Sequence, residues 1–159
     1  VGHLQTNKVK YVARFAREFH ALDSLRLAET LDARLDREGR SLDVYVQVNT
    51  SGEESKYGLR PGDLPAFLDE LKRFPRLRPR GLMTLAVFST DPDKVRPCFE
   101  RLRALCDMAV RHDAEIRELS MGMSNDFEEA IVQGADVVRV GEAIFGKRST
   151  PDGHYWPKD

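Results

Sequence analysis

The sequence predicts an α/β fold built on a parallel sheet. Apolar, β-branched segments alternate with amphipathic segments in five strand-then-helix units that run in one direction. Two of the later strands end in tight turns, at residues 122–126 and 140–143, where glycine or serine leads into a helix start. A closed β/α barrel needs eight strands. The pattern therefore leaves two alternatives, an open α/β sheet or a barrel from which about three N-terminal strands are missing.

Helices are predicted where apolar residues recur at helical spacing, in most cases behind a capping residue. Thr6, Ser24 and Ser124 are the expected caps of three of them, and Gly134 is expected to end the last. In chain order, the predicted helices cover residues 6–19, 24–35, 61–71, 95–109 and 126–133.

Strands are predicted for the short apolar runs between these helices. The clearest is residues 42–49, because its side chains are β-branched and aromatic. No linker or change of composition divides the chain, so we expect residues 1–148 to form one domain. Residues 149–159 are polar and contain proline and glycine, which predicts a loose tail. In chain order, the predicted strands cover residues 20–22, 42–49, 80–85, 119–121 and 136–140.

The composition is that of one folded domain, with 159 residues of which 41% are hydrophobic and 32% charged. A net charge of −1 gives no general attraction to nucleic acid. No apolar run approaches the ~20 residues of a membrane span and no signal peptide is evident, so we expect a cytoplasmic protein without membrane partners. The histidines lack metal-ligand spacing, so no metal site is predicted. Cys98 and Cys106 lie about 12 Å apart along one predicted helix and are expected to stay reduced.

The two glycine or serine turns are the best candidates for a binding site. Helix starts that follow strands present free N–H groups and a partial positive charge, which attract phosphate. Ser124 can add its hydroxyl, and Gly141 lets a ligand approach the backbone closely. The alternatives are an ordinary helix cap and ordinary turn chemistry. Two such turns in succession favour phosphate binding, because the loops after the last two strands of a β/α barrel form such a site.

Three further residues are candidates by their place along the chain. Arg139 stands in an otherwise apolar strand, and a buried arginine needs either a carboxylate or a ligand as partner. Its position at the carboxyl end of the strand favours the ligand, because barrel sites form at that end. Asn49 ends the clearest strand at the same edge. His3 can line the mouth of a pocket, although a polar loop is the favoured explanation for it.

Several short strings together resemble the pyridoxal-phosphate homeostasis protein family, whose members are similar to the barrel domain of bacterial alanine racemase. The strings LSMGMS at 119–124 and RVG at 139–141 are the most specific. The resemblance covers almost the whole chain to about residue 148, in family order. The other strings are GHLQTNK at 2–8, QVNTS at 47–51, ESKYG at 54–58, RGLMT at 80–84 and IFG at 144–146.

The resemblance implies a (β/α)8 barrel of TIM-barrel type, of which this chain supplies about five C-terminal units, with pyridoxal 5′-phosphate at its mouth. Arg139 would face the pyridine nitrogen and keep it unprotonated, because an arginine cannot give up its proton. Glu142 stands where many relatives have serine or threonine, so we expect only its N–H to contribute. The implied cofactor-binding residues are Met123, Ser124, Arg139, Gly141 and Glu142, with His3, Asn49 and Met83 as weaker candidates.

The function implied by the resemblance is binding of pyridoxal 5′-phosphate in intracellular cofactor homeostasis, as a carrier or buffer with no firmly assigned reaction. The family's Schiff-base lysine lies on the first barrel strand, which this sequence does not include, so no catalytic residue is assigned. We expect a monomer for the full-length protein and self-association for this piece. One alternative is a racemase-like enzyme acting on amino acids, which would need that lysine and a tyrosine as acid or base. The other is a degenerate piece that binds no cofactor and requires a partner.

Overall fold

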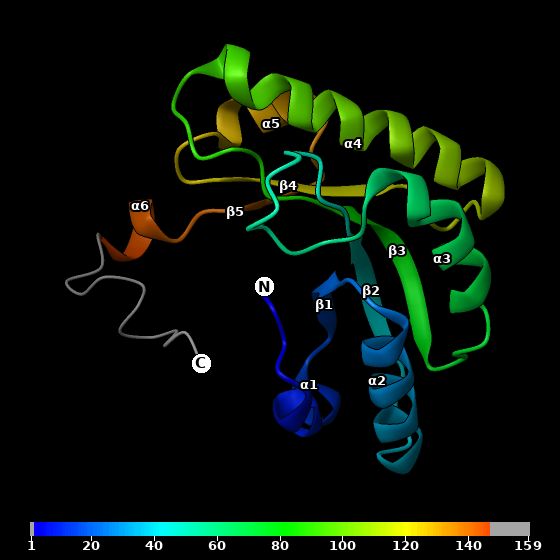
Figure 1. The fold of residues 1–159 in the computed structure, drawn as a ribbon. Helices are drawn as coiled ribbons and strands as arrows, with labels where there is room; N and C mark the ends of the chain where they lie inside the picture. The colour runs from blue at the N-terminus through cyan, green and yellow to red at the C-terminus, as the bar shows by residue number, and fades with distance from the viewer. Residues whose placement is uncertain (1, 147–159) are drawn as a thin grey trace.

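Five parallel strands form one sheet in the computed structural model, which describes residues 2–146 (Figure 1). The strand order is the order of the chain, so each strand lies beside its predecessor. A sheet that winds in one direction places its connecting helices on one face, because strand-helix-strand crossovers are right-handed. The strands are β1 (Glu18–Leu22), β2 (Leu42–Gln47), β3 (Leu77–Met83), β4 (Glu118–Met123) and β5 (Val137–Arg139).

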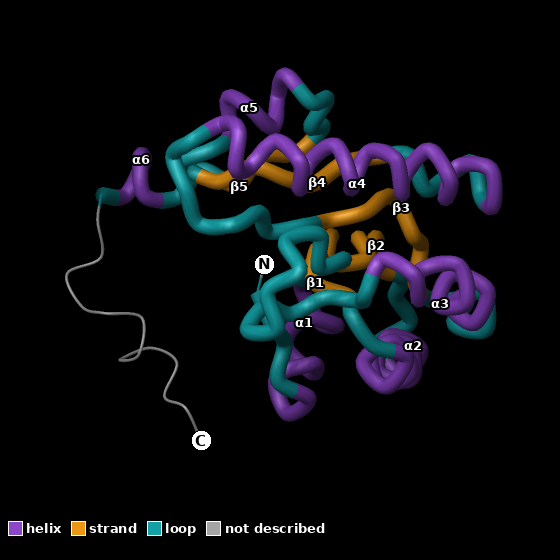
Figure 2. The backbone as a smooth tube through the Cα atoms, turned by 45° about the horizontal axis from the view of Figure 1, so that its top comes forward, coloured by secondary structure: helices purple, strands orange, loops and turns teal. Residues whose placement is uncertain are grey.

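All helices but the last cover the outer face of this sheet, and Figure 2 shows them in an arc outside the strands. A curved parallel sheet with helices on one side only is the arrangement of a β/α barrel. The partial barrel is therefore confirmed over an open sheet with helices on both faces. The helices are α1 (Val9–Phe15), α2 (Leu25–Arg37), α3 (Leu64–Leu71), α4 (Pro92–His112), α5 (Phe127–Val132) and α6 (Glu142–Phe145), with 3₁₀ turns at Thr6–Lys8 and Pro61–Asp63.

The core lies between the sheet and the helix layer. The helix α2 shows why this sequence packs as it does, because its buried residues recur at helical spacing and its charged residues fall on the other side. Each buried leucine contributes about 1.5–3 kcal/mol to folding. Ser24 caps α2 as predicted, since its Oγ accepts from the Leu27 N–H at 3.3 Å. The buried residues of α2 are Leu27, Ala28, Leu31 and Leu35.

Gly81 determines how closely β3 approaches β4. It pairs in register with Tyr45 of β2 and Glu118 of β4. A Cβ atom at this position would lie 1.9 Å from the carbonyl oxygen of Glu118, so any larger residue would force the strand backbones apart. The Tyr45 hydroxyl reaches across β3 and donates to the Glu118 carboxylate.

The predicted helix over residues 6–19 is wrong at both ends. Thr6 begins a 3₁₀ turn and provides no side-chain cap. The helix α1 ends at Phe15, and Ala16 is extended, with φ −67° and ψ 145°. The strand β1 begins at Glu18 because the segment pairs with β2 as its parallel neighbour. Tertiary pairing therefore overrides the helical spacing of the apolar residues here.

The remaining predicted elements are present with shifts at their ends. The strand predicted at 80–85 begins earlier and ends earlier, as Leu77–Met83. Cys98 and Cys106 are both buried on α4 as free thiols, as predicted. The predicted tail at 149–159 lies outside the described residues.

Candidate functional site

The loops after β4 and β5 meet at the carboxyl edge of the sheet. The backbone N–H of Glu142 donates to Ser124 Oγ over 3.1 Å, which joins the two turns that the sequence singles out. The prediction that Ser124 caps the following helix is wrong, because the N-cap residue of α5 is Asp126 and the Ser124 hydroxyl serves the neighbouring loop. A Cβ atom at Gly141 would meet nothing within 4 Å, so open space lies beside these groups.

Met123 ends β4 with its side chain 47% exposed. Its backbone N–H donates to Asp126 Oδ1 at 2.6 Å, and the Asp126 N–H donates back to the Met123 carbonyl at 3.1 Å. A carboxylate therefore already accepts from the backbone donor that the resemblance assigns to a phosphate. Sequence reasoning missed this role of Asp126, although aspartates commonly bind nearby backbone N–H groups in turns.

The guanidinium of Arg139, at the end of β5, is held by two hydrogen bonds. Its Nη1 donates to Ser120 Oγ and its Nη2 to the Thr84 carbonyl, each at 2.8 Å. Its Nε is buried without a partner, and Arg139 makes no ion pair within residues 2–146. Burial lowers the pKa of Arg139 to about 10, so the group remains protonated at neutral pH. Arg139 is part-buried and Asp126 acts on its charge without forming an ion pair, so the cation is suited to a ligand that accepts hydrogen bonds.

His20 and Ser120 extend this arrangement across the inner face of the sheet. They belong to strands that β2 and β3 separate, yet His20 Nδ1 lies 2.8 Å from Ser120 Oγ. Only a strongly curved sheet brings these side chains together. His20 Nε2 in turn lies 3.1 Å from Glu18 Oε2. The side chains of Glu18, His20, Ser120 and Arg139, which we call the inner polar chain, thus connect β1 to β5.

The imidazole of His20 is fixed by its neighbours. The ring stacks on Tyr45, with 3.9 Å between ring centroids and 21° between planes. Burial lowers the pKa of His20, while Glu18 acts in the opposite direction. Burial also raises the pKa of Tyr45, and the hydrogen bond to Glu118 adds to the effect. Sequence reasoning missed Glu18, His20 and Ser120. The one feature that could have indicated them is that they are polar residues in otherwise apolar strands.

Of the three weaker candidates, His3 and Asn49 lie in other segments, whereas Met83 pairs with Ser120 on β4. His3 stacks on Tyr57 with centroids 4.3 Å apart, and its Nδ1 lies 3.8 Å from Asp23 Oδ2. Met83 is fully buried at the end of β3. The amide of Asn49 donates to two carbonyls of the following loop and accepts from Ser51 Oγ and the Gly52 N–H, so its hydrogen-bonding capacity is used within the loop. The four bonds of Asn49 are to Glu53 O, Lys56 O, Ser51 Oγ and Gly52 N.

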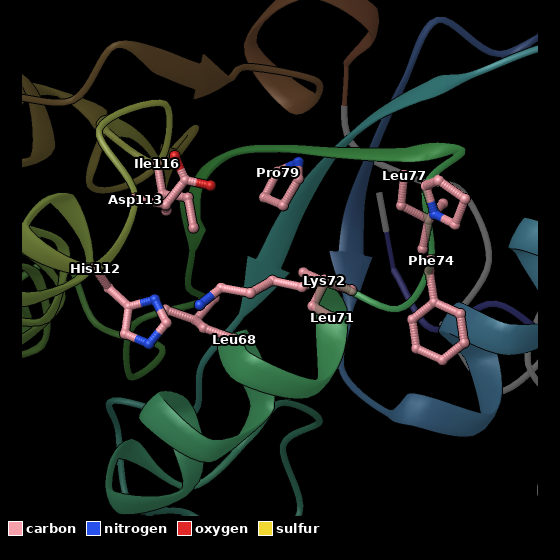
Figure 3. Close-up of a pocket in the computed structure, with 10 residues that line it drawn as sticks. Leu68, Leu71, Lys72, Phe74, Leu77, Pro79, His112, Asp113 and Ile116 are labelled. Atoms are coloured by element: carbon pink, nitrogen blue, oxygen red, sulfur yellow. The ribbon is translucent and has the colours of Figure 1, made fainter.

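A pocket between α3, β3 and the end of α4 lies at the opposite, amino edge of the sheet (Figure 3). Leu77 and Pro79 at the start of β3 line it together with Ile116, which precedes β4. His112 beside it contacts Asp69 over 3.1 Å. No predicted site residue lines this pocket, and β/α barrels bind ligands at the other edge.

Residues 2–146 lack two further features, a cluster of metal ligands and a membrane-spanning helix. In that part of the chain, no three His, Cys, Asp or Glu side chains come together as ligands for a metal ion. None of its helices combines the length and the apolar character that crossing a membrane requires.

Residues 1–149 match the family model of the alanine racemase N-terminal domain. The chain belongs to this family. Within the alanine racemase N-terminal domain family, it is similar to the pyridoxal phosphate homeostasis protein of Aquifex aeolicus (strain VF5), with 40% identity over 149 residues. The matched region is 93% of this chain and 65% of that relative, so the chain spans less than two thirds of the relative's length.

Solved structures that are similar to this chain have the same architecture. PipY of Synechococcus elongatus PCC7942, solved with PLP bound, is 32% identical with a TM-score of 0.81, and the match covers 92% of this chain and 68% of PipY. An alanine racemase from Clostridium difficile 630 gives a TM-score of 0.74 at 15% identity, covering 96% of this chain and 40% of the racemase. The second similarity concerns the fold alone, and both agree with a partial barrel.

Proposed function

We propose that this chain binds pyridoxal 5′-phosphate and serves intracellular cofactor homeostasis without catalysing a reaction. One observation carries the proposal: the Glu142 N–H and the Ser124 hydroxyl converge within 3.1 Å, next to open space at Gly141. The names of the Aquifex aeolicus relative and of the PipY structure support it, because both mention this cofactor. The near-zero net charge supports a small-molecule partner rather than nucleic acid.

The residues present fit the phosphate of this cofactor. Phosphate oxygens accept hydrogen bonds, and a serine hydroxyl and backbone N–H groups at a helix start donate them. Ser124 would hold the phosphate together with the backbone at 141–142, where the Glu142 N–H donates to Ser124 Oγ and would turn to the phosphate instead. The N–H of Met123 would join them only after the Asp126 carboxylate releases it. The carboxylate of Glu142 opposes an anion, so we expect its side chain to turn away.

Arg139 fits the ring nitrogen of the cofactor. Its guanidinium only donates hydrogen bonds and stays protonated, so it favours a ring nitrogen that carries a lone pair. When bound, pyridoxal 5′-phosphate supplies an electrophilic aldehyde and an electron-withdrawing ring. An unprotonated ring nitrogen withdraws electrons less strongly, which supports a carrier rather than a catalyst. Arg139 and Ser124 would therefore supply binding and orientation.

Calorimetric titration tests the proposal with two ligands that differ only in the phosphate. We expect pyridoxal 5′-phosphate to bind and pyridoxal to bind much more weakly. Ser124→Ala should lower the affinity for pyridoxal 5′-phosphate about tenfold, because a charge-assisted hydrogen bond is lost. Ser41→Ala is the matched control, since Ser41 precedes β2 at the amino edge.

Two outcomes would contradict parts of the proposal. Equal affinity for pyridoxal and its phosphate, or an unchanged affinity in Ser124→Ala, would remove the phosphate site. Sustained racemisation of alanine by the loaded protein, followed by circular dichroism of the amino acid, would overturn the non-catalytic role.

A further inference from the structure

We propose that His20 is a positioning residue for Arg139, and that the inner polar chain holds the guanidinium in place only while His20 is neutral. The inference rests on the proposed function, because it takes Arg139 as the group that recognises the ring nitrogen of the cofactor. It adds a site of control about which the resemblance and the relatives' names say nothing. The contacts that carry it are His20 to Ser120 and Ser120 to Arg139, each 2.8 Å long.

The direction of each hydrogen bond in the chain follows from the chemistry of its ends. Arg139 can only donate, so Ser120 Oγ accepts from Nη1. An ionised Glu18 can only accept, so His20 Nε2 must carry a proton. A neutral His20 then has a lone pair on Nδ1, which accepts the Ser120 hydroxyl proton. Arg139 therefore donates to Ser120, Ser120 donates to His20, and His20 donates to Glu18. All of these hydrogen bonds point toward β1.

Protonation of His20 breaks this order. The new proton sits on Nδ1 and is donated to Ser120 Oγ, whose second lone pair accepts it beside the bond from Arg139. The serine hydroxyl loses its acceptor, and a second positive charge approaches the guanidinium. Because Nε of Arg139 has no partner, Ser120 and the Thr84 carbonyl are what fix the plane of that group. Acid should therefore release Arg139 from its orientation.

The neighbours of His20 favour its neutral form. Burial is the largest influence on the ring, Arg139 also opposes a positive charge there, and Glu18 alone favours it. The Tyr45 ring prevents His20 from turning away, because the two rings stack. The titratable and charged side chains around His20 and its stacking partner are Glu18 on β1, Tyr45 on β2, Arg80 on β3, Glu118 on β4 and Arg139 on β5.

The first test needs no ligand and reads the tautomer directly. In the ¹⁵N spectrum of the imidazole-labelled chain at pH 7.5, we expect His20 to be neutral with its proton on Nε2. His112, which is paired with Asp69 at the amino edge, serves as an internal comparison. A His20 that is protonated, or that carries its proton on Nδ1, at pH 7.5 would overturn the inference. This result is independent of whether the chain binds pyridoxal 5′-phosphate.

The second test isolates recognition of the ring nitrogen. Pyridoxine 5′-phosphate and benzyl phosphate both carry a phosphate ester on a ring, but only the first has a ring nitrogen. We expect the ratio of their affinities to fall about three- to tenfold as the pH is lowered from 7.5 through the pKa of His20, which burial holds below its ordinary value. This is the effect of one hydrogen bond. His20→Asn keeps an acceptor for the Ser120 hydroxyl but cannot be protonated. The affinity ratio of this variant should therefore decrease less at low pH than that of the wild-type chain. The ligands' own titration is the same in both proteins.

Two variants complete the design. His20→Leu removes the acceptor and should show the low ratio across this pH range. Ser120→Ala interrupts the inner polar chain at its centre and should also show the low ratio across the range. An identical pH profile in the wild-type chain and in His20→Asn would overturn the inference. If neither phosphate ester binds the wild-type chain, the proposed function fails, and the ¹⁵N spectrum still decides the state of His20.

Discussion

The loop after β2 and the loops after β4 and β5 are polar segments at the same edge of the sheet, and they use their polar groups differently. In the first, the amide of Asn49 makes four hydrogen bonds, all within residues 49–56. In the second, Glu142 and Ser124 join separate loops beside open space. Each strand end keeps one buried side-chain atom without a partner, Gln47 Oε1 on β2 and Arg139 Nε on β5, so these atoms do not separate the regions. A polar loop whose bonds close on itself supports the fold, whereas loops that meet beside open space have capacity for a ligand.

The largest effect is expected when the sheet that carries both sets of loops is disturbed, because both then lose their support. Gly81→Ala should lower the free energy of unfolding by about 3 kcal/mol, because the new Cβ meets strand backbone at 1.9 Å. Gly62→Ala is the control, since a Cβ there meets nothing within 4 Å. Urea denaturation of the two variants gives the difference, and equal stability would show that β3 and β4 do not approach so closely.

Removing the unpaired cation should affect binding more than stability. Arg139→Gln should lower the affinity for pyridoxal 5′-phosphate about tenfold, because a charged donor is lost. The free energy of unfolding should change by no more than about 1 kcal/mol, since burying an unpaired charge is itself costly. Arg60→Gln, at an exposed residue paired with Asp63, is the matched control for titration calorimetry and denaturation. A large loss of stability without a loss of affinity would reverse the assignment.

The loop after β2 should respond in the opposite way. Asn49→Ala should lower the free energy of unfolding by about 1 kcal/mol, because the loop loses hydrogen bonds that hold its turns together. Its affinity for pyridoxal 5′-phosphate should stay within about threefold of the wild-type value. Thermal denaturation and calorimetry on the same sample separate the two effects. An affinity loss as large as that of Arg139→Gln would place Asn49 in the binding site.

The smallest expected effect concerns the charge at position 142. Glu142→Thr should tighten binding of pyridoxal 5′-phosphate about two- to threefold, because a carboxylate no longer opposes the phosphate while the backbone N–H remains. Glu142→Gln removes the charge at nearly constant size and should behave alike. An unchanged affinity in both variants would mean that the carboxylate does not act on the ligand.

Local patterns in the sequence were enough to predict much of the fold. The cap at Ser24 and the buried face of α2 follow from residue type and spacing within a few positions. The end of α1 could not be predicted in this way, because pairing of β1 with β2 determines it. The number and direction of strand-helix units left an open sheet and a partial barrel as alternatives. The strand order, which no local pattern contains, decided between them.

In the candidate site too, local features could be predicted and long-range contacts could not. The meeting of Ser124 with Glu142 was foreseeable from two successive strand-turn-helix patterns, and so was the place of Arg139 at a strand end. The inner polar chain was not, because His20 and Ser120 are 100 positions apart and meet only through the curvature of the sheet. The hydrogen bond from Met123 to Asp126 was also missed. A backbone N–H in a turn can donate either to a nearby side chain or to a ligand, and the sequence does not say which.

The carboxylate of Asp126 has a consequence for how a bound anion leaves. A loop that binds phosphate through backbone N–H groups usually faces unsatisfied donors once the phosphate departs. Here the Asp126 side chain accepts from the N–H of Met123, so this donor is satisfied within the turn itself. An anion that binds at this N–H would displace one side chain, and the turn would need no refolding when the anion leaves.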